Sequence, residues 1–392
     1  MTAAAGLDLA GGRVIDPAHR LDTIANVSID GNVITSVGAA PAAGGGGRQR
    51  IDVAGTLVTP GLVDLHTHLY PGVSHYGVEP DERCLGRGVT MAVDAGSAGA
   101  QTFPGLRRYV IERSRTRIFA FLNIAVQGMI TNLVGELEDI RWGSSEQAVA
   151  RARENQGLIV GIKVRLGYQM VGEDPMPALR LAREAADELG LPLMVHVIDI
   201  RPGLAWLLPQ MRPGDVVTHC FHGNEGGIID SRGRVIPAAV GARDGGVLFD
   251  VGHGVGSFAY RVARSAIEQG FPPDTISSDL HAHNAEGPVF DLATTLSKLL
   301  HVGMPLQDVV RAATSTPASA IGKGDRAGAL AQGGDADLSV FELRTGGWAL
   351  PDAAGDTEVV EQLLVPRMVI RAGQTFDIRP TPAGVLASQV RS

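Results

Sequence analysis

Apolar residues in the 392-residue chain follow two patterns, one in its middle and one at both ends. From about residue 57 to residue 322, short apolar runs alternate with segments whose apolar residues recur at helical spacing. Eight runs have the length and composition of buried strands: 61–68, 89–95, 118–125, 158–164, 193–198, 216–221, 247–251 and 275–280. Helices are predicted between most of them, as in 145–155, 177–189 and 260–269. This alternation predicts an α/β fold, a (β/α)8 TIM barrel.

At both ends of the chain, the apolar runs are separated by turn residues instead of helices. Before the barrel, strands are predicted at 12–16, 25–29 and 33–37. After it, short strands are predicted at 328–330, 336–341 and 365–370. We expect residues 1–57 and 328–392 to combine in a small accessory β-sandwich domain, and residues 58–327 to form the barrel. A doubly wound open sheet is the alternative, but no glycine-rich nucleotide loop follows the first strand.

The composition is that of a soluble enzyme, with 44% hydrophobic and 19% charged residues. The formal net charge of −8, without a basic stripe, argues against nucleic acid as a partner. No apolar stretch reaches the roughly 20 residues that span a bilayer, so no membrane segment is expected. The two cysteines cannot build a disulfide framework, and the N-terminus lacks the pattern of an export signal. We therefore expect a cytoplasmic protein.

Two histidines, His66 and His68, stand at the end of the first apolar run. Side chains alternate between the two faces of a strand, so both imidazoles project from the same side. Two imidazoles on a rigid strand provide half of a site for a divalent metal ion. The alternative is a half-buried strand that happens to carry two histidines, and the pair alone does not decide between these interpretations.

Further metal-ligating side chains follow at the ends of later runs, where barrel enzymes place their active sites. These are Lys163 on the fourth run, His196 on the fifth, His219 on the sixth and Asp279 on the eighth. A single buried histidine is usually a structural residue, but scattered structural histidines would not gather at strand ends. The distribution therefore favours a metal centre at the carboxyl ends of the strands.

Lys163 is the one charged residue in the apolar run 158–164. An ammonium about 4 Å from a dication would experience a repulsion of roughly 8 kcal/mol at an effective dielectric constant near 20. The lysine therefore cannot stay protonated among metal ligands, and burial also favours the neutral amine. A neutral amine can add carbon dioxide to form a carbamate whose two oxygens can bridge two metal ions. The alternative is a lysine that extends from the strand end into solvent.

The order His-x-His, Lys, His, His, Asp across a barrel flanked by a split β domain resembles the amidohydrolase superfamily. The chain is similar to its binuclear branch with a carboxylated lysine, which contains dihydroorotases, hydantoinases and the amidohydrolase/deacetylase group. The resemblance covers nearly the whole chain and includes the closing segments 328–330 and 333–337. Residues 162–165 (Ile-Lys-Val-Arg) and 218–223 (Thr-His-Cys-Phe-His-Gly) are most similar to the deacetylase group.

This resemblance implies two divalent metal ions, expected to be zinc, although manganese or iron could occupy the same ligands. One ion would be held by His66, His68, Lys163 and Asp279, and the other by Lys163, His196 and His219. A hydroxide bridging the ions would attack the scissile carbonyl, and Asp279 would be the catalytic proton shuttle to the leaving group. A serine hydrolase is disfavoured, since the chain contains no Gly-x-Ser-x-Gly motif.

The expected substrate is a small molecule that carries a carboxylate. Arg165 lies two residues after Lys163 on the same side of the strand, where its guanidinium could bind a carboxylate through two parallel hydrogen bonds. The alternative for Arg165 is an ion pair with a neighbouring acidic residue. Further predicted substrate contacts are Tyr168, His222, Asn224, His253 and His281. For each of these, a structural role in a loop is the alternative.

Dihydroorotases carry an arginine soon after His-x-His, whereas this chain continues with residues 69–72 (Leu-Tyr-Pro-Gly), and the tyrosine placement of hydantoinases is also absent. The predicted activity is therefore hydrolysis of an amide or ester in a small acylated carboxylic acid, such as an N-acyl amino acid or an O-acetyl hydroxy acid. The alternatives are a cyclic amidase of the dihydroorotase or hydantoinase type and a non-catalytic scaffold relative. Barrels of this kind often self-associate, so a homo-oligomer is an expected state.

Overall fold

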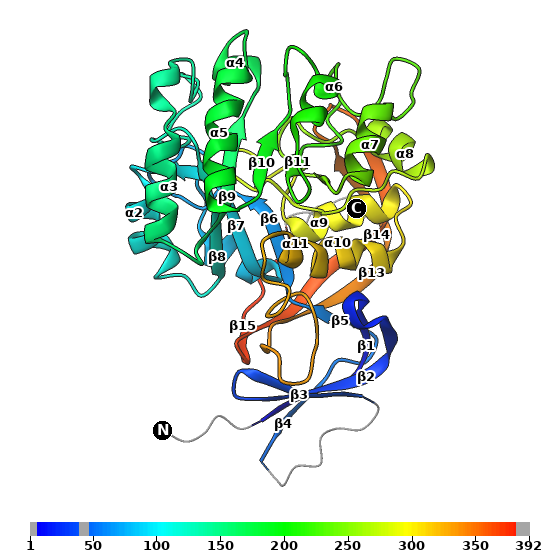
Figure 1. Ribbon diagram of the computed structural model, residues 1–392. Helices are drawn as coiled ribbons and strands as arrows, with labels where there is room; N and C mark the ends of the chain where they lie inside the picture. Colours follow the sequence, from blue (N-terminus) through cyan, green and yellow to red (C-terminus); the bar gives the residue numbers. More distant parts are fainter. Residues whose placement is uncertain (1–5, 39–46, 382–392) are drawn as a thin grey trace.

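The computed structural model describes residues 6–38 and 47–381, which contain a parallel and a mostly antiparallel sheet (Figure 1). The parallel sheet has seven strands in the order β12-β11-β10-β9-β8-β7-β6. They are β6 (Leu62–Thr67), β7 (Val89–Gly99), β8 (Arg117–Asn123), β9 (Ile159–Arg165), β10 (Leu193–His196), β11 (Val216–Thr218) and β12 (Leu248–Asp250). Each strand lies within or overlaps one of the first seven apolar runs, because strands that are buried on both faces need apolar side chains on both.

The eighth apolar run, 275–280, is not a regular strand but contacts both edge strands of the parallel sheet. Thr275 forms a parallel bridge with Asp250 at the end of β12, and Leu280 forms one with Thr67 at the end of β6. The sheet is therefore curled, and its two edges meet the same segment. Asp279 adopts φ +50°, a left-handed conformation that a continuous strand does not accommodate.

Helices follow several of the parallel strands, and the local sequence sets their ends. Helix α3 (Ser145–Glu154) begins after Ser144, whose hydroxyl accepts a hydrogen bond from the Gln147 amide at 3.2 Å. Helix α5 (Met176–Leu189) ends at Gly190, whose φ of +63° supplies the left-handed conformation common at helix ends. Together with α8 (Tyr260–Glu268), these helices confirm the three predicted helical segments to within one residue at each end.

The remaining helical segments are mostly short and connect the strands. The α-helices are α1 (Pro80–Arg83), α2 (Phe103–Leu106), α4 (Tyr168–Val171), α6 (Leu204–Leu207), α7 (Pro237–Asp244), α9 (Leu292–His301), α10 (Leu306–Ala312) and α11 (Ser315–Ala320). Single turns of other helical types are η1 (Pro17–His19), η2 (Leu85–Arg87), η3 (Arg107–Ile111), η4 (Ile140–Trp142) and η5 (Leu208–Gln210). Across the described ranges, no helix combines the length and the apolar character needed to cross a membrane.

The second sheet combines strands from both ends of the chain, in the order β15-β14-β13-β5-β1-β2-β3, with β4 paired to β1. Its strands are β1 (Leu7–Asp16), β2 (Leu21–Asp30), β3 (Val33–Gly38), β4 (Gln49–Asp52), β5 (Leu57–Pro60), β13 (Leu338–Pro351), β14 (Thr357–Arg371) and β15 (Gln374–Phe376). Strand β5 joins the two ends, since it pairs with β1 and with β13. The predicted strand at 328–330 is wrong: Gly328 has φ +80°, and the Leu330 amide donates to the Asp16 carboxylate at 2.8 Å.

The hairpin of β13 and β14 is longer than the strands predicted from the sequence, and its outer half runs alongside the unit built on the parallel sheet (Figure 1). There Trp348, Leu350 and Val360 pack with Phe290 in an apolar cluster. The amide of Ala353, in the turn of the hairpin, donates a hydrogen bond to the Phe258 carbonyl at 2.9 Å. The turn of this hairpin therefore lies against the loops at the carboxyl ends of the parallel strands.

Candidate active site

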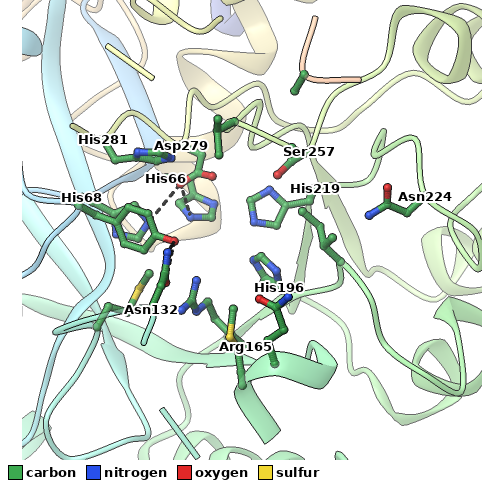
Figure 2. A pocket seen from close by; sticks show the side chains of 18 of the residues that line it. His66, His68, Asn132, Arg165, His196, His219, Asn224, Ser257, Asp279 and His281 are labelled. Atoms are coloured by element: carbon green, nitrogen blue, oxygen red, sulfur yellow. Dashed lines mark hydrogen bonds and ion pairs between the residues drawn. The ribbon is translucent and has the colours of Figure 1, made fainter. Parts of the chain in front are cut away.

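A cavity of about 530 Å³ lies at the carboxyl ends of the parallel strands (Figure 2). All six metal ligands predicted from the sequence line this cavity: His66, His68, Lys163, His196, His219 and Asp279. All of them except His196 are buried, and His196 is half-buried. Side chains from β6, β9, β10 and the segments after β11 and β12 thus meet in one place, as the position of the strand ends predicts.

The polar atoms of these side chains point at one another. Asp279 Oδ1 lies 3.0 Å from His68 Nε2 and 3.3 Å from His66 Nε2. Lys163 Nζ lies 3.4 Å from His66 Nε2. Ligand atoms of His66, His219 and Asp279 all lie within 4.8 Å of one another, a spacing that could hold a metal ion. The donor set therefore converges as a metal centre requires.

His196 and His219 form the other half of the cluster. Their ring centroids are 4.4 Å apart, and the His219 centroid is 5.0 Å from that of His66. His219 thus lies next to both of the other rings (Figure 2). Lys163, which contacts His66, stands where it could serve both halves of the cluster.

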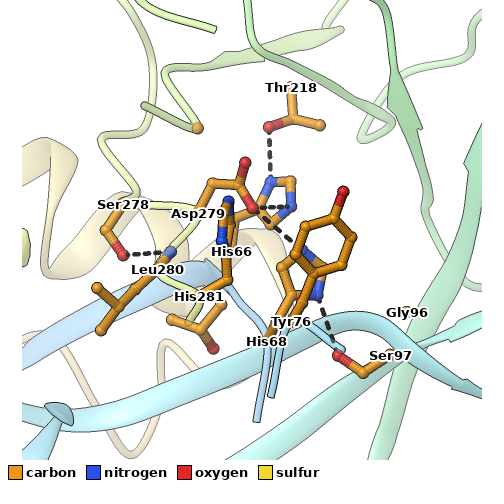
Figure 3. A network of polar contacts seen from close by, with 12 residues as sticks. His66, His68, Tyr76, Gly96, Ser97, Thr218, Ser278, Asp279, Leu280 and His281 are labelled. Carbon is orange, nitrogen blue, oxygen red and sulfur yellow. Dashed lines mark hydrogen bonds and ion pairs between the residues drawn. The ribbon is translucent and has the colours of Figure 1, made fainter. Parts of the chain in front are cut away.

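Contacts at Nδ1 fix the orientation of three imidazoles, and Figure 3 shows those of His66 and His68. His66 Nδ1 contacts Thr218 Oγ1 at 2.8 Å, and His68 Nδ1 contacts Ser97 Oγ at 3.0 Å. His219 Nδ1 contacts the Gly252 carbonyl oxygen at 2.7 Å, so this nitrogen carries the proton. Partners on Nδ1 leave Nε2 free to face the cavity, which is the arrangement found around histidine ligands of metals.

Asp250, at the end of β12, supports this arrangement from behind. Its carboxylate accepts hydrogen bonds from the hydroxyls of Thr218, Thr275 and Ser277 at 2.6–2.7 Å. Because Thr218 donates to Asp250, its oxygen is left to accept from His66 Nδ1. Burial raises the pKa of Asp250, and the three hydroxyl donors act against that increase.

Two of the clustered residues adopt left-handed backbone conformations that L-amino acids rarely take. His219 has φ +72° and Asp279 has φ +50°. Asp64 holds the chain beside Asp279, since its carboxylate accepts from the Ser278 amide at 3.0 Å and from the Ser278 hydroxyl at 2.5 Å. Strained residues that persist in a well-packed structure often belong to functional sites.

The electrostatics of the cavity favour neutral imidazoles. Burial lowers the pKa of His68 and His219 to about 3, and it also lowers the pKa values of His66 and His196. Burial lowers the pKa of Lys163 to about 7, with Asp279 acting in the opposite direction. Neutral imidazoles have the free electron pair that a metal ligand needs, so the residues present fit a metal centre.

Arg165 lines the cavity but has a protein partner. Its Nε donates to the Glu136 carboxylate at 2.8 Å, and both side chains are buried. Although burial disfavours the charged guanidinium, Glu136 raises the pKa of Arg165. The ion pair that was the alternative for Arg165 is therefore present, and the guanidinium charge is already neutralised.

Replacing Arg165 by methionine is expected to lower the free energy of unfolding by about 3–5 kcal/mol, because Glu136 would remain as a buried, unpaired carboxylate. The double variant Arg165→Met/Glu136→Gln should recover most of this loss. Urea denaturation measures both effects. Arg141→Met is the matched control, since the Arg141–Asp139 ion pair is exposed and its loss should leave the unfolding transition unchanged. Equal losses in the single and double variants would contradict the importance of this pair.

The other predicted substrate contacts divide into two groups. Asn224 and His281 line the cavity, whereas Tyr168, His222 and His253 do not. The Arg201 Cζ atom lies 3.7 Å from the centroid of the Tyr168 ring. His222 Nδ1 accepts a hydrogen bond from the backbone N–H of Asn224 at 3.2 Å. His253 is buried against Phe258 and contacts Lys298 Nζ at 2.8 Å. Each of these three residues therefore has a structural partner, which is the alternative stated for it, and a contact of these residues with substrate stays a prediction.

Several residues that line the cavity were not predicted from the sequence: Tyr76, Asn132, Ser257, Arg261, Ala353 and Ala354. Tyr76 stacks on His68 with ring centroids 5.3 Å apart, and its hydroxyl accepts from the Asn132 amide at 2.7 Å. Ser257 ends the glycine-rich loop 252–257 that follows β12, and Arg261 comes shortly after it. The position of this loop after the seventh apolar run could therefore have indicated that both residues lie near the cavity. No local sequence signal places the turn of a distant hairpin at this cavity.

Comparison with known proteins agrees with this arrangement. Residues 259–376 match the model of the amidohydrolase family. The chain is 41% identical over 323 residues to a deacetylase of Agrobacterium fabrum (strain C58), covering 82% of this chain and 79% of that protein. A solved structure described as a dihydroorotase is 36% identical with a TM-score of 0.88, covering 96% of this chain and 99% of that one. Another, described as an adenine deaminase, is 31% identical with a TM-score of 0.88, covering 95% and 100%.

Proposed function

Because the chain belongs to the amidohydrolase family and is a metal-dependent hydrolase, we propose that it cleaves an amide or ester bond in a small acylated carboxylic acid. The substrate class is an N-acyl amino acid or an O-acetyl hydroxy acid. The observation that carries the proposal is the meeting of four imidazoles, one lysine amine and one carboxylate in a single cavity. The 41% identity to a protein named deacetylase supports the removal of an acyl group.

The proposed ligand sets use every polar side chain of the cluster. His66, His68, Lys163 and Asp279 would hold one divalent ion, and Lys163, His196 and His219 the other. Zinc is the expected ion for this mixture of imidazole and oxygen ligands. When bound, the ions supply Lewis acidity toward the scissile carbonyl and a hydroxide nucleophile at neutral pH.

Asp279 is proposed to move the proton during hydrolysis. Its Oδ1 faces His66 and His68. Its Oδ2 lies close to Gly254, since a Cβ atom built on this glycine would be 2.5 Å from Asp279 Oδ2. As the oxygen of water bonds to the carbonyl carbon, one proton passes to the Asp279 carboxylate. That proton then reaches the leaving nitrogen or oxygen as its bond to the carbonyl carbon breaks. The products are a carboxylic acid and an amine or alcohol.

Lys163 is proposed to carry a carbamate, in which Nζ bonds to the carbon of carbon dioxide and releases a proton. Lys298 provides a comparison, because burial lowers the pKa of both lysines to about 7. Lys298 Nζ has three acceptors at 2.6–2.8 Å, which are His253 Nε2 and the carbonyls of Pro288 and Pro351, and this arrangement suits an ammonium. Within the described ranges, the hydrogen-bond partner of Lys163 Nζ is His66 Nε2 alone. Lys163 is thus the lysine whose environment favours the neutral, reactive amine.

The test is a comparison of substrates with zinc-loaded enzyme. N-Acetyl amino acids and O-acetyl hydroxy acids should be hydrolysed with kcat/KM at least about tenfold above that of cyclic amides, a difference of about 1.4 kcal/mol in transition-state binding. Removal of the metal with a chelator should abolish this activity, and added zinc should restore it. Preferential cleavage of cyclic amides would overturn the substrate proposal, and full activity in the chelated enzyme would overturn the metal proposal.

A cyclic amidase is the second candidate function. It is favoured by the 36% identity to the structure described as a dihydroorotase. The cyclic amides in the comparison test it directly, and the ligand set would be the same for both reactions. The two candidates therefore differ only in how the rest of the cavity recognises the substrate.

For the architecture, we propose that residues 58–327 form a closed (β/α)8 barrel in which segment 275–280 takes the eighth position. The bridges of this segment to β6 and to β12 support the closure. Residues 1–57 and 328–392 are proposed to form the accessory β-sandwich domain. Of these, residues 1–5, 39–46 and 382–392 lie outside the described residues.

A further inference from the structure

We propose that Arg261 binds the carboxylate of the substrate, with Asn224 and Ser257 beside it. This inference rests on the proposed function, because it names the group that recognises the acid part of an acylated carboxylic acid. Arg261 is the second residue of α8 and lines the same cavity as the proposed metal ligands. It takes the carboxylate-binding role that the sequence suggested for Arg165.

The charges around the cavity support this assignment. Lys163, Arg165 and Arg261 are its lysine and arginine side chains. Arg165 is neutralised by Glu136, and Lys163 is buried among the proposed ligands. Within the described ranges, Arg261 forms no ion pair with a carboxylate; its guanidinium donates to the Gly223 carbonyl at 2.5 Å. Because a guanidinium has five N–H groups, most of its donors remain available for a ligand.

The neighbouring polar groups are also available. In the part of the chain that the structure describes, neither the Ser257 hydroxyl nor the Asn224 side-chain amide forms an intramolecular hydrogen bond, although Ser257 is only 3% exposed. Both side chains lie on the His219 side of the cavity, away from Asn132 and His68 (Figure 2). Because Ser257 lines the cavity, its hydroxyl can hydrogen bond to a ligand there. Arg261, which donates to the carbonyl of Gly223 next to Asn224, adds a further donor to this wall of the cavity, and a carboxylate can accept from several donors.

The position of Ser257 connects this group to the reacting centre. A Cβ added to Gly254 would lie 2.5 Å from Asp279 Oδ2 and 2.8 Å from Ser257 Oγ. The hydroxyl and the proposed proton carrier are therefore close to the same point. A carboxylate that contacts Ser257 and Arg261 would lie only a few bonds from the scissile carbonyl, which fits an acyl group on the α-nitrogen or α-oxygen of an acid.

Much of the remaining cavity wall is apolar, and its polar side chains Tyr76, Asn132 and Gln169 carry no charge. Met129, Met170 and Ile198 line it, together with Val255 and Ala354. These side chains offer an apolar surface and no charge to a substrate side chain. We therefore infer that the substrate combines a free carboxylate with an apolar side chain. An acidic or basic side chain would lose hydration there without gaining a partner.

The test uses Arg261→Met and Arg261→Lys in the zinc-loaded enzyme. The substrate pair is N-acetylphenylalanine and its uncharged primary amide, with both enantiomers of each. For the free acid, Arg261→Met should lose about 10- to 100-fold in kcat/KM, mainly through a higher KM, as expected for loss of a charge-assisted hydrogen bond. Activity on the primary amide should stay within about twofold of wild type, and Arg261→Lys should recover part of the loss. Arg108→Met is the matched control, since Arg108 is exposed and does not line the cavity.

A binding experiment separates this inference from the proposed hydrolysis. Calorimetric titration with phenylacetate and with phenylacetamide should show that wild type prefers the acid and that Arg261→Met removes the preference. If no acylated acid is hydrolysed but this preference depends on Arg261, the proposed function is wrong and the carboxylate site stands. If Arg261→Met keeps the preference for phenylacetate, or if wild type has none, the inference is overturned, whatever the enzyme hydrolyses.

Discussion

Replacing Asp279 by asparagine is expected to lower kcat by about three orders of magnitude, the upper part of the range for loss of a general acid–base group. The amide has nearly the same shape as the carboxylate, but its nitrogen cannot accept the proton of the attacking water. It also presents a neutral group to the proposed metal ligands, so metal affinity should fall. Steady-state kinetics with an acylated amino acid, at saturating zinc, measures the first effect, and metal analysis after dialysis measures the second.

The fold should survive this substitution, because Asp64 and Asn284 hold the backbone next to residue 279. Asn284 Nδ2 donates to the Asp279 carbonyl at 2.8 Å, and Asp64 binds Ser278. Circular dichroism and thermal unfolding should therefore resemble wild type. Asp308→Asn, which removes only a surface ion pair with Arg311, serves as the control. Turnover within tenfold of wild type would refute the role of Asp279 as proton carrier.

Replacing Lys163 by alanine is expected to abolish activity and to reduce the bound metal from two ions to one or none. The substitution removes the group proposed to be shared by both ions, and it leaves a cavity between His66 and the neighbouring strand. Because that cavity has the size of the lost side chain, a short-chain carboxylic acid such as propionate should enter it and restore part of the activity. Metal analysis and activity with increasing propionate measure these effects.

Spectroscopy can test the modification of Lys163 directly. The chain contains three lysines, Lys163, Lys298 and Lys323. After exchange with ¹³C-labelled bicarbonate, one carbamate signal is expected in wild type and none in Lys163→Ala. Lys323→Ala, which removes a lysine placed over the Phe119 ring, should retain both signal and activity. A signal that persists in Lys163→Ala, or a wild-type enzyme with full activity and no signal, would contradict the carbamate.

Most of the parallel sheet could be predicted from the sequence, because strands such as β9 and β10 are buried on both faces and therefore stand out as apolar runs. The eighth run was predicted as a strand but forms isolated bridges to β6 and β12 instead, because the left-handed conformation of Asp279 interrupts an extended segment. Long-range contacts were harder to predict. The length of the β13–β14 hairpin depends on its packing against Phe290, a residue that is distant in sequence.

The candidate metal ligands could be proposed because the ends of parallel strands meet at one edge, so histidines far apart in sequence had to lie together. Substrate contacts could not be predicted in the same way. The partner of Arg165 is Glu136, which lies in an irregular loop whose path no periodic pattern reveals. The proposed role of Arg261 likewise depends on which positively charged side chains of the cavity already form an ion pair with a carboxylate. That is a property of the folded molecule, not of local sequence.

Strand pairing across the whole chain has a consequence for biosynthesis. Thr59, on β5 of the second sheet, hydrogen bonds to Ser339, 280 residues later, and Ala354 lines the cavity. On the ribosome, β5 therefore emerges long before β13 exists, and the edge of β5 that pairs with β13 stays open during synthesis. Contacts between such distant segments form slowly. The enzyme should consequently acquire its activity only after β13 and β14 have been synthesised, in a late step that pairs β13 with β5.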